Sequence, residues 1–436
     1  MKKWLFLTLL VSFTVILSGC TLPFTKPKPE NITLKYWGLW EPEQIMRGVI
    51  NDYQKLHPNI TIEYKRMSPQ RYRETVTTRL AENVGPDIFR FHNTWLPMLK
   101  NDLSPIPPEV MDQATIKKTY YPVVTKDLAI GDKYYGLPLE MDVLALYINS
   151  DIFNAAGVTP PGSWEEFKIT AQKVTTKSEG KIQTAGAAIG TANNIQHWSD
   201  ILGLMLLQNG TEMTKVDNTI LSDGSNAGVD AIDYYASFAI GENRVWDETL
   251  DDSVMAFSQG KVAMIFAPHW QIFEIKVINP NLNFYIAPVP QLSGGKVNWA
   301  TYWVEGVAKK SKYQKEAFEF LKYLTAKETV QKLYSDASKY RLFGEPYSRI
   351  EMAPLIKDDQ FAGVFVKEAE TATSWYMSSR TYDNGLNDKI IQYFTVAVDG
   401  LNKESVTTKN ALTTVANGIN SLLSQYGLIS GGVPQK

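Results

Sequence analysis

The sequence predicts an α/β protein, and three observations lead to this class. Short runs with an apolar residue at every second position alternate with longer runs of helical periodicity over most of the chain. Apolar residues make up 44% of the 436 residues and charged residues 21%, which is the ordinary balance of a folded globular protein. The length allows two or three globular units, and the chain contains no internal repeat.

The first elements follow the order strand, helix, strand, helix, strand. Residues 32–37 predict a strand whose positions 32, 34 and 36 share one face. Residues 41–56 predict a helix, because Pro42 suits a first turn and apolar side chains recur at positions 45, 49, 53 and 56. A strand at 60–64, a helix at 70–83 and a strand at 86–91 follow. Strands separated by helices of this length favour parallel βαβ units.

The alternation extends to about residue 308, and the remainder is mostly helical. The predicted strands are 144–148, 186–190, 261–266, 283–287 and 303–308, and the predicted helices are 164–178, 198–208, 314–324, 360–371, 384–398 and 405–423. Local signals mark several ends. Ser163 and Glu166 form a capping box, Asn149 or Ser150 caps the helix that follows it, and Gly260 provides a turn before a strand.

The only cysteine, Cys20, ends a segment that is typical of secretion. Two lysines precede an uncharged apolar stretch at 4–17, which is too short for a comfortable membrane span. Leu17-Ser-Gly-Cys20 resembles the bacterial lipobox, whose cysteine is lipidated and becomes the first residue of the mature chain. We therefore expect a signal peptide at 1–19, a lipid on Cys20 and a proline-containing tether within 20–31. The alternative is an ordinary signal peptide with an incidental cysteine.

The near-neutral charge restricts the partners. Lys and Arg total 44, Asp and Glu total 46, and the net charge is −2. This balance excludes a nucleic-acid binder that relies on a basic footprint, and it suits an uncharged ligand better than an ionic one. A single cysteine can form neither an internal disulfide nor a structural zinc cluster, and we expect no cofactor and no metal site. No stretch after the N-terminal segment reaches the ~18 uninterrupted apolar residues of a spanning helix.

Several short motifs occur in an order that resembles one known family. They are Gly85-Pro-Asp87 with Phe89-Arg-Phe91, Tyr135-Gly-Leu-Pro138, Leu146-Tyr-Ile-Asn-Ser-Asp-Ile-Phe153, Pro161-Gly-Ser-Trp-Glu-Glu-Phe167, and Phe257-Ser-Gln-Gly-Lys-Val-Ala-Met264 followed by Trp270. With these motifs in this order, the chain resembles the family 1 extracellular solute-binding proteins of ABC importers, the group that includes maltose-binding protein. The resemblance covers about residues 30–425.

The resemblance implies a two-lobed periplasmic-binding-protein-like fold of the class II type, with a hinge and a cleft between the lobes. Lobe one would comprise residues 32–140 plus 301–343, and lobe two residues 141–300 plus 344–436. The implied function is capture of a sugar or oligosaccharide by a lipoprotein on the outer face of the cell membrane, which passes the solute to the permease subunits of an ABC transporter. We expect a monomer that binds no nucleic acid and catalyses no reaction.

Sugar recognition needs aromatic rings against the C–H faces of the sugar and polar side chains around its hydroxyls. Trp residues with polar neighbours are therefore the first binding candidates. Ligands bind at the carboxyl ends of the strands in open α/β sheets. Trp40 and Glu41 follow the first predicted strand, and His92 and Asn93 follow the third. These four residues are binding candidates, although Glu41 also suits a helix N-terminus and His92 also suits a buried core position.

The other candidates lie near the expected crossovers or within lobe two. Glu140 and Asp142 fall at the first crossover, where the resemblance implies an acidic sugar ligand. The resemblance also implies sugar stacking on Trp270 and an aromatic stacking position at Trp375 and Tyr376. The set is completed by His197, Trp198, Tyr302 and Trp303. Helix-interior or mid-strand positions are expected in the core instead, as for Trp164, Trp246 and Trp299.

Two alternatives stay open. The same fold would also hold a non-sugar solute such as a polyamine, a glycerol phosphate compound or a peptide, but a polyamine site needs more acidic groups than the sequence places there. A glycan-processing surface enzyme is the weaker alternative. Glu140 and Asp142 are close neighbours rather than two carboxylates facing each other across ~5–10 Å, and no Gly-x-Ser-x-Gly, His-Glu-x-x-His or Walker sequence occurs.

Overall fold

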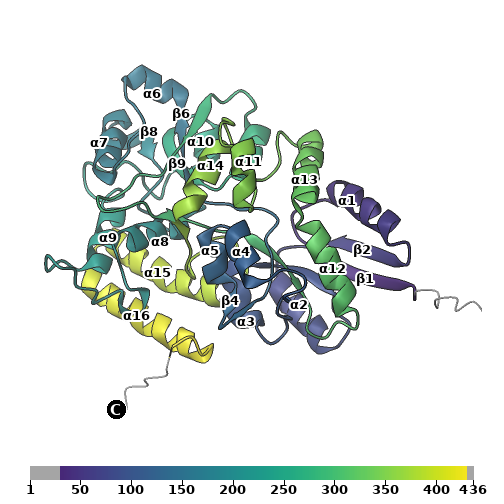
Figure 1. The fold of residues 1–436 in the computed structure, drawn as a ribbon. Coiled ribbons are helices and arrows are strands. Elements are labelled where there is room, and N and C mark those ends of the chain that lie inside the picture. Colours follow the sequence, from purple (N-terminus) through teal and green to yellow (C-terminus); the bar gives the residue numbers. More distant parts are fainter. Residues whose placement is uncertain (1–29, 430–436) are drawn as a thin grey trace, which may run out of the picture.

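The computed structural model describes residues 30–429, which form two lobes, each built on its own sheet (Figure 1). The α/β class predicted from the sequence is confirmed. The predicted signal peptide and the predicted lipidation site at Cys20 lie outside the described residues. Between residues 30 and 429, no helix combines the length and the hydropathy that a membrane span requires.

The first sheet has the strand order β12-β3-β1-β2. β1 (Ile32–Gly38) pairs in parallel with both β2 (Ile60–Arg66) and β3 (Ile88–His92), as the βαβ pattern predicts. β12 (Trp303–Val307) returns from much later in the chain and pairs antiparallel with β3. β1 alternates buried and less buried positions, whereas β3 is buried along its whole length.

The second sheet has the order β10-β6-β9-β8-β7, and here the parallel expectation is largely wrong. β6 (Ala145–Asn149) pairs antiparallel with β9 (Val262–Ala267) and with β10 (Phe284–Ala287). Only β8 (Lys181–Ala187) and β9 run parallel. The physical reason is that β6 pairs with β9 and β10, which lie far along the chain, so no single strand–helix–strand unit fixes their relative direction.

One predicted helix is too long and one predicted strand is displaced. α7 (Trp164–Val174) ends where Thr175 adopts an extended conformation, and the next residues form β7 (Thr176–Ser178), which pairs with β8. A run of β-branched residues favours this change, and Glu179 and Gly180, both at positive φ, turn the chain into β8. The strand predicted at 186–190 therefore begins at Lys181.

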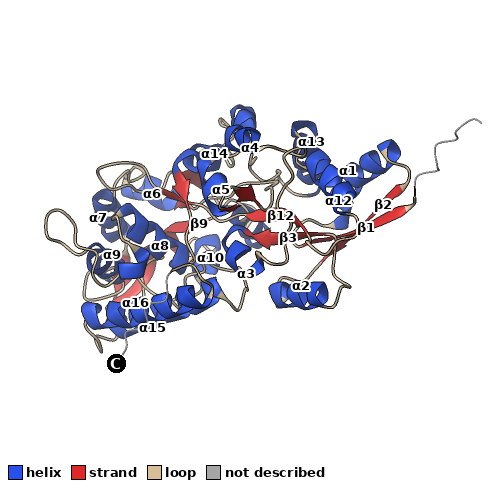
Figure 2. Ribbon diagram, turned by 60° about the horizontal axis from the view of Figure 1, so that its bottom comes forward, coloured by secondary structure: helices blue, strands red, loops and turns tan. Residues whose placement is uncertain are grey.

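Helices surround both sheets. Before β6 lie α1 (Glu43–Leu56), α2 (Tyr72–Ala81), α3 (Leu96–Leu99), α4 (Gln113–Thr119) and α5 (Pro122–Asp127). Between β6 and β12 lie α6 (Ser150–Ala156), α7, α8 (Trp198–Gln208), α9 (Ala227–Ala236), α10 (Ser253–Ser258) and α11 (Gln271–Ile278). After β12 lie α12 (Gln314–Leu324), α13 (Lys327–Tyr340), α14 (Gly363–Glu368), α15 (Leu386–Asn402) and α16 (Thr408–Gln425). Figure 2 shows α1, α12 and α13 on one face of the first sheet and α2 on the other.

Short elements complete the chain. They are the strands β4 (Ala129–Ile130), β5 (Lys133–Tyr134), β11 (Asn298–Trp299) and β13 (Ala372–Thr373), and the 3-10 turns Asn93–Trp95, Met213–Lys215, Ile350–Leu355 and Ala369–Thr371. The predicted local signals are present as well. Ser163 and Glu166 form the reciprocal capping box, Asn149 caps α6, and Gly260 has φ +73°. The periodicity did not predict α13, which packs against α1.

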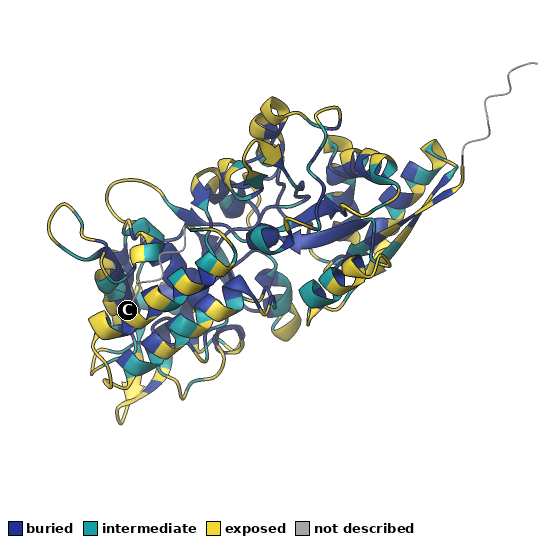
Figure 3. Ribbon diagram, turned by 90° about the horizontal axis from the view of Figure 1, so that it is seen from below, coloured by how far each residue is buried: buried dark blue, intermediate teal, exposed yellow. Residues whose placement is uncertain are grey.

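Three neighbouring segments connect the two sheets, at residues 135–144, 300–302 and 341–347. Isolated β-bridges join them, from Glu140 to Tyr347 and from Val143 to Ala300. Figure 3 shows that the strands next to this junction are buried while the outer helices are exposed. Because only a few backbone segments link the lobes here, a change at these segments can alter how the lobes face each other.

Candidate functional site

A cavity of about 290 Å³ lies at this junction and is lined from both lobes. The lining residues are Trp40, Glu41, His92, Glu140, Met141, Asp142, His197, Pro268, Trp270, Phe273, Glu274, Thr301, Tyr302, Trp303, Arg341, Glu345, Ser379 and Arg380. Its volume is close to the lower limit of ordinary small-molecule sites, roughly 300–1,000 Å³. The dimensions suit a small, compact solute.

The sheet topology explains how the first lobe contributes to this cavity. β1 and β3 run parallel, so their carboxyl ends meet at one edge of the sheet and carry Trp40, Glu41 and His92 to it. β12 runs the other way, so its amino end contributes Trp303 at the same edge. From the second lobe, Trp270 follows β9 and starts α11.

Aromatic rings form two walls of the cavity. Trp40 packs edge-on against Trp303 with ring centroids 5.6 Å apart, and Trp303 is supported in turn by His92 at 5.1 Å. Trp40 remains 38% exposed, so its ring is accessible. On the other lobe, Trp270 packs edge-on against His197 at 5.6 Å, and the Arg380 guanidinium lies 4.8 Å from the Trp270 ring centroid.

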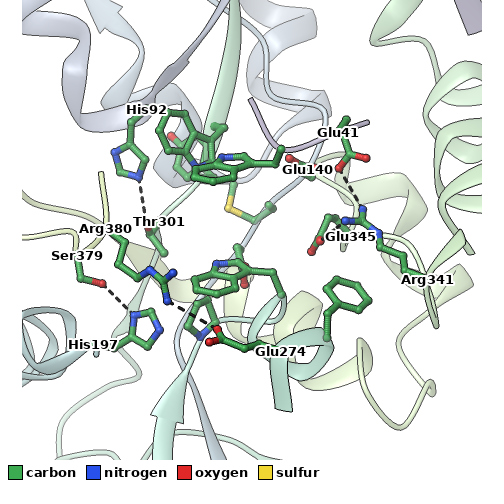
Figure 4. Close-up of a pocket in the computed structure, with 18 residues that line it drawn as sticks. Glu41, His92, Glu140, His197, Glu274, Thr301, Arg341, Glu345, Ser379 and Arg380 are labelled. Carbon is green, nitrogen blue, oxygen red and sulfur yellow. Dashed lines mark hydrogen bonds and ion pairs between the residues drawn. The ribbon is translucent and has the colours of Figure 1, made fainter. Parts of the chain in front are cut away.

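Carboxylates and two arginines gather at one end of the cavity. Arg341 pairs with Glu41 at 3.1 Å and with Glu345 at 3.3 Å. Behind Glu140, the buried Arg90 lies 3.0 Å from Glu140, and it donates from Nε to Glu305 over 2.6 Å. Figure 4 shows Glu41, Glu140, Glu345 and Arg341 grouped at this end.

Burial perturbs the acidity of these carboxylates. It raises the pKa of Glu140 to about 8, although the Arg90 charge opposes this rise. Burial also raises the pKa of Asp142 well above its usual range, despite backbone N–H groups of Val143 and His269 that donate to Oδ1 at 2.9 and 2.8 Å. For Glu345, burial is outweighed by the hydrogen bond to His269 and the charge of Arg341, which hold its pKa below the usual value.

The opposite end of the cavity carries imidazole rings that contact hydroxyl side chains. His92 Nδ1 lies 2.7 Å from the Thr94 hydroxyl and Nε2 lies 2.9 Å from the Thr301 hydroxyl. Burial lowers the pKa of His92 to about 3, so its imidazole is neutral at physiological pH. His197 Nδ1 lies 2.9 Å from the Ser379 hydroxyl, and this pair faces Arg380 in Figure 4. Hydroxyl and imidazole groups of this kind can exchange hydrogen bonds with sugar hydroxyls.

Nine of the thirteen binding candidates line this cavity: Trp40, Glu41, His92, Glu140, Asp142, His197, Trp270, Tyr302 and Trp303. Four do not, and for these the placement expected from the sequence is wrong. Asn93 begins the 3-10 turn after β3, and its amide donates to Asp127 over 2.8 Å, so it lines another cavity. Trp198 is buried, 7% exposed, within the first turn of α8.

Trp375 and Tyr376 line a second cavity instead, of about 330 Å³, together with Asn93 and Asp127. The cause is the pairing of β13 with β11, which places the residues that follow against α5. The Ser374 hydroxyl donates to Asp127 over 2.7 Å at this contact. A sequence match cannot show such a pairing, because its two strands are far apart in the chain.

Sequence reasoning missed half of the lining residues: Met141, Pro268, Phe273, Glu274, Thr301, Arg341, Glu345, Ser379 and Arg380. A signal existed for Phe273 and Glu274, since they lie three and four residues after Trp270 on α11 and therefore share a face with it. Arg341 comes from the end of the unpredicted α13, and no periodic pattern points to it or to Ser379 and Arg380.

The cavity has no cluster suited to a metal. Within residues 30–429, no group of three or more His, Cys, Asp or Glu side chains is arranged to hold a metal ion. The lining arrangement of aromatic walls, carboxylates and hydroxyls is that of a site that binds an organic solute.

Comparison with known proteins finds a matching family model, related sequences and a similar fold. Residues 39–331 match the family model described as bacterial extracellular solute-binding protein. The multiple sugar-binding protein of Streptococcus mutans is 22% identical over 343 residues, which cover 74% of this chain and 78% of that protein. The arabinooligosaccharide-binding protein of Bacillus subtilis is 24% identical over 362 residues, covering 74% and 76%. The structure of the sugar-binding protein MalE from Xanthomonas citri superposes with a TM-score of 0.73 at 17% identity, covering 90% of this chain and 98% of that one.

Proposed function

The chain belongs to the bacterial extracellular solute-binding protein family, a family of binding proteins, and from this premise we propose that it captures a sugar or oligosaccharide outside the cell and delivers it to an ABC importer. The observation that carries the proposal is the cavity between the lobes, with Trp40 and Trp303 on one wall and Trp270 on the other. Rings on facing walls can cover the C–H faces of a sugar while hydroxyl and carboxylate groups at the ends bind its hydroxyls.

The proposal includes a mechanism of delivery. Lobe one, residues 32–140 plus 301–343, and lobe two, residues 141–300 plus 344–436, close on the solute by motion at the three connecting segments, so the measured affinity contains the cost of closure. The closed, loaded form is the one that the permease subunits receive. The protein acts as a monomer and carries out no chemistry on its solute.

The proposal also includes the anchor. Cys20 carries a lipid that holds the body at the outer face of the cell membrane, and the residues up to 31 act as the tether. Fractionation of expressing cells tests this part. The full chain is expected in the membrane fraction, and Cys20→Ser is expected to release it. If the full chain and Cys20→Ser associate equally with the membrane, the proposed lipid anchor is refuted, while the proposed solute site is unaffected.

Binding is tested by titration calorimetry and tryptophan fluorescence with a panel of mono- and oligosaccharides and, as competing solutes, a polyamine, glycerol phosphate and a peptide mixture. At least one saccharide is expected to bind without turnover. Trp270→Ala is expected to weaken it about ten- to hundredfold, because a stacking ring is lost.

Trp375→Ala is the matched control. It removes the same type of side chain from the second cavity, and the affinity is expected to stay within about twofold. Binding of a non-sugar solute alone, or hydrolysis of a glycan by the purified protein, would refute the proposed function. A larger loss in Trp375→Ala than in Trp270→Ala would move the site to the second cavity.

A further inference from the structure

The cavity between the lobes has more carboxyl groups than guanidinium groups, a local imbalance that the whole-chain charge conceals. Five carboxylates line it, Glu41, Glu140, Asp142, Glu274 and Glu345, against the guanidiniums of Arg341 and Arg380. The near-neutral chain suggested an uncharged solute, but affinity depends on the local charge, since buried charges are screened far less than surface ones.

Both guanidinium groups that line the cavity already pair with carboxylates. Arg341 is shared by Glu41 and Glu345 at 3.1 and 3.3 Å, and Arg380 lies 3.8 Å from Glu274. The cavity therefore offers an anionic solute no unshared cation, and a phosphate or carboxylate group would meet a surplus of carboxylates. This argues against a glycerol phosphate compound as the solute.

Unlike the guanidiniums, some of the lining carboxylates lack a cationic partner of their own within the described part of the chain. Arg90, behind the cavity, divides its charge between Glu140 and Glu305. Asp142 is only 8% exposed, pairs with no cation among the described residues, and receives both of its hydrogen bonds on Oδ1. Glu41 is 6% exposed, and its Oε2 has no hydrogen-bond partner within residues 30–429. Buried oxygens of this kind are costly unless something donates to them.

A bare metal ion does not account for this excess, because the described carboxylates and imidazoles form no group of three that converges on one point. An ammonium group on an organic solute does, since it carries three donors and a positive charge in a compact volume. The aromatic walls accept the body of such a solute, and the His92 and His197 rings with their hydroxyl partners can bind its hydroxyls.

We propose that the solute is an amine-bearing saccharide, whose protonated amine binds at Glu140 and Asp142 and whose sugar ring lies between Trp40 and Trp270. This inference rests on the proposed function and narrows it to one class of sugar. The carboxylates of Asp142 and Glu140, both in the cavity lining, accept the N–H donors of the amine. Burial raises the pKa of both carboxyls, and an ammonium bound beside them stabilises their charged forms, which a neutral sugar of the same shape cannot do.

The test uses matched pairs that differ at one substituent. Titration calorimetry at pH 6.5 compares glucosamine with glucose, galactosamine with galactose, and the glucosamine disaccharide with both cellobiose and its N-acetylated form. In the pair that binds, the amine is expected to bind at least about tenfold more tightly than the neutral member, as one charge-assisted contact allows. Tighter binding by every neutral member overturns the inference and leaves the proposed function standing.

Two variants test which carboxylates produce the preference for the amine-bearing saccharide. Asp142→Asn keeps the shape of the side chain and the oxygen that accepts from two backbone N–H groups, and it is expected to reduce the ratio of amine to neutral-sugar affinity to less than about threefold. Glu140→Gln is the second variant, in case the first folds poorly by circular dichroism. Glu82→Gln, whose carboxylate pairs with Arg79 on the surface away from the cavity, is the control and should keep the preference. Unchanged preference in both Asp142→Asn and Glu140→Gln refutes the placement, and binding of no saccharide in any pair refutes the proposed function itself.

Discussion

Replacing Arg90 with Met should destabilise the protein by about 3–5 kcal/mol. Arg90 is 2% exposed and holds Glu305 at 2.6 Å and Glu140 at 3.0 Å. Met has a similar length and fills much of the same space, but it leaves two buried carboxylates without their cation, and removal of one partner from a buried pair costs about this much. The loss is large beside the ~5–15 kcal/mol that stabilises an ordinary domain.

The assay is urea unfolding followed by tryptophan fluorescence and circular dichroism, at pH 8 and at pH 5. Burial raises the pKa of both Glu140 and Glu305, so without Arg90 both are protonated more easily in the folded state than in the unfolded chain. A carboxyl whose folded pKa is raised destabilises the fold as the pH rises through that range. The deficit of Arg90→Met is therefore expected to be smaller at pH 5 than at pH 8.

Arg79→Met is the control, because Arg79 pairs with Glu82 on the surface, with both side chains about half exposed. An exposed pair of this type contributes about 0–1 kcal/mol, so the free energy of unfolding should barely change. A loss below about 1 kcal/mol in Arg90→Met, or a loss that is equal at the two pH values, would refute the reasoning. The second result would point to packing rather than to buried charge.

Three further predictions concern local features. Burial lowers the pKa of His92 from 6.5 to about 3, so the unfolded chain binds a proton that the folded protein does not. The free energy of unfolding should therefore fall as the pH drops below 6.5, by up to about 1.4 kcal/mol per pH unit. In urea unfolding, His92→Gln should lose this part of the pH dependence. Gly186→Ala should cost about 1–3 kcal/mol or more in thermal and urea unfolding, since a Cβ would lie 1.8 Å from the Ala171 carbonyl oxygen, whereas Gly162→Ala, whose nearest atom is 3.6 Å away, should be nearly neutral. Ser163→Ala should cost about 1 kcal/mol because it removes the capping box of α7; an unchanged urea midpoint would contradict this.

Much of the local structure was predictable because it depends on residues close together in the chain. β1, α1, β2, α2 and β3 were predicted in order, and the capping box before α7 was predicted at its two residues. The approximate place of the cavity was predictable too, since parallel strands of one sheet must present their carboxyl ends together. This rule alone indicated Trp40, Glu41 and His92.

The features that could not be predicted depend on contacts between distant segments. The antiparallel pairing of β6 involves the distant strands β9 and β10, and the position of Trp375 in the second cavity follows from the pairing of β13 with β11. Arg341 reaches the cavity only because α13 packs against α1 and ends at the junction. None of these contacts leaves a periodic pattern in the sequence.

By itself, the sequence determined the α/β class and a set of aromatic and acidic residues at strand ends. Local periodicity and local hydrogen bonding decide these features, and both are written in neighbouring residues. Only the tertiary structure decided the charge of the cavity. A net charge of −2 over 436 residues says nothing about five carboxyl groups that come from several segments and line one cavity, because electrostatic energy depends on distance in space and not along the chain.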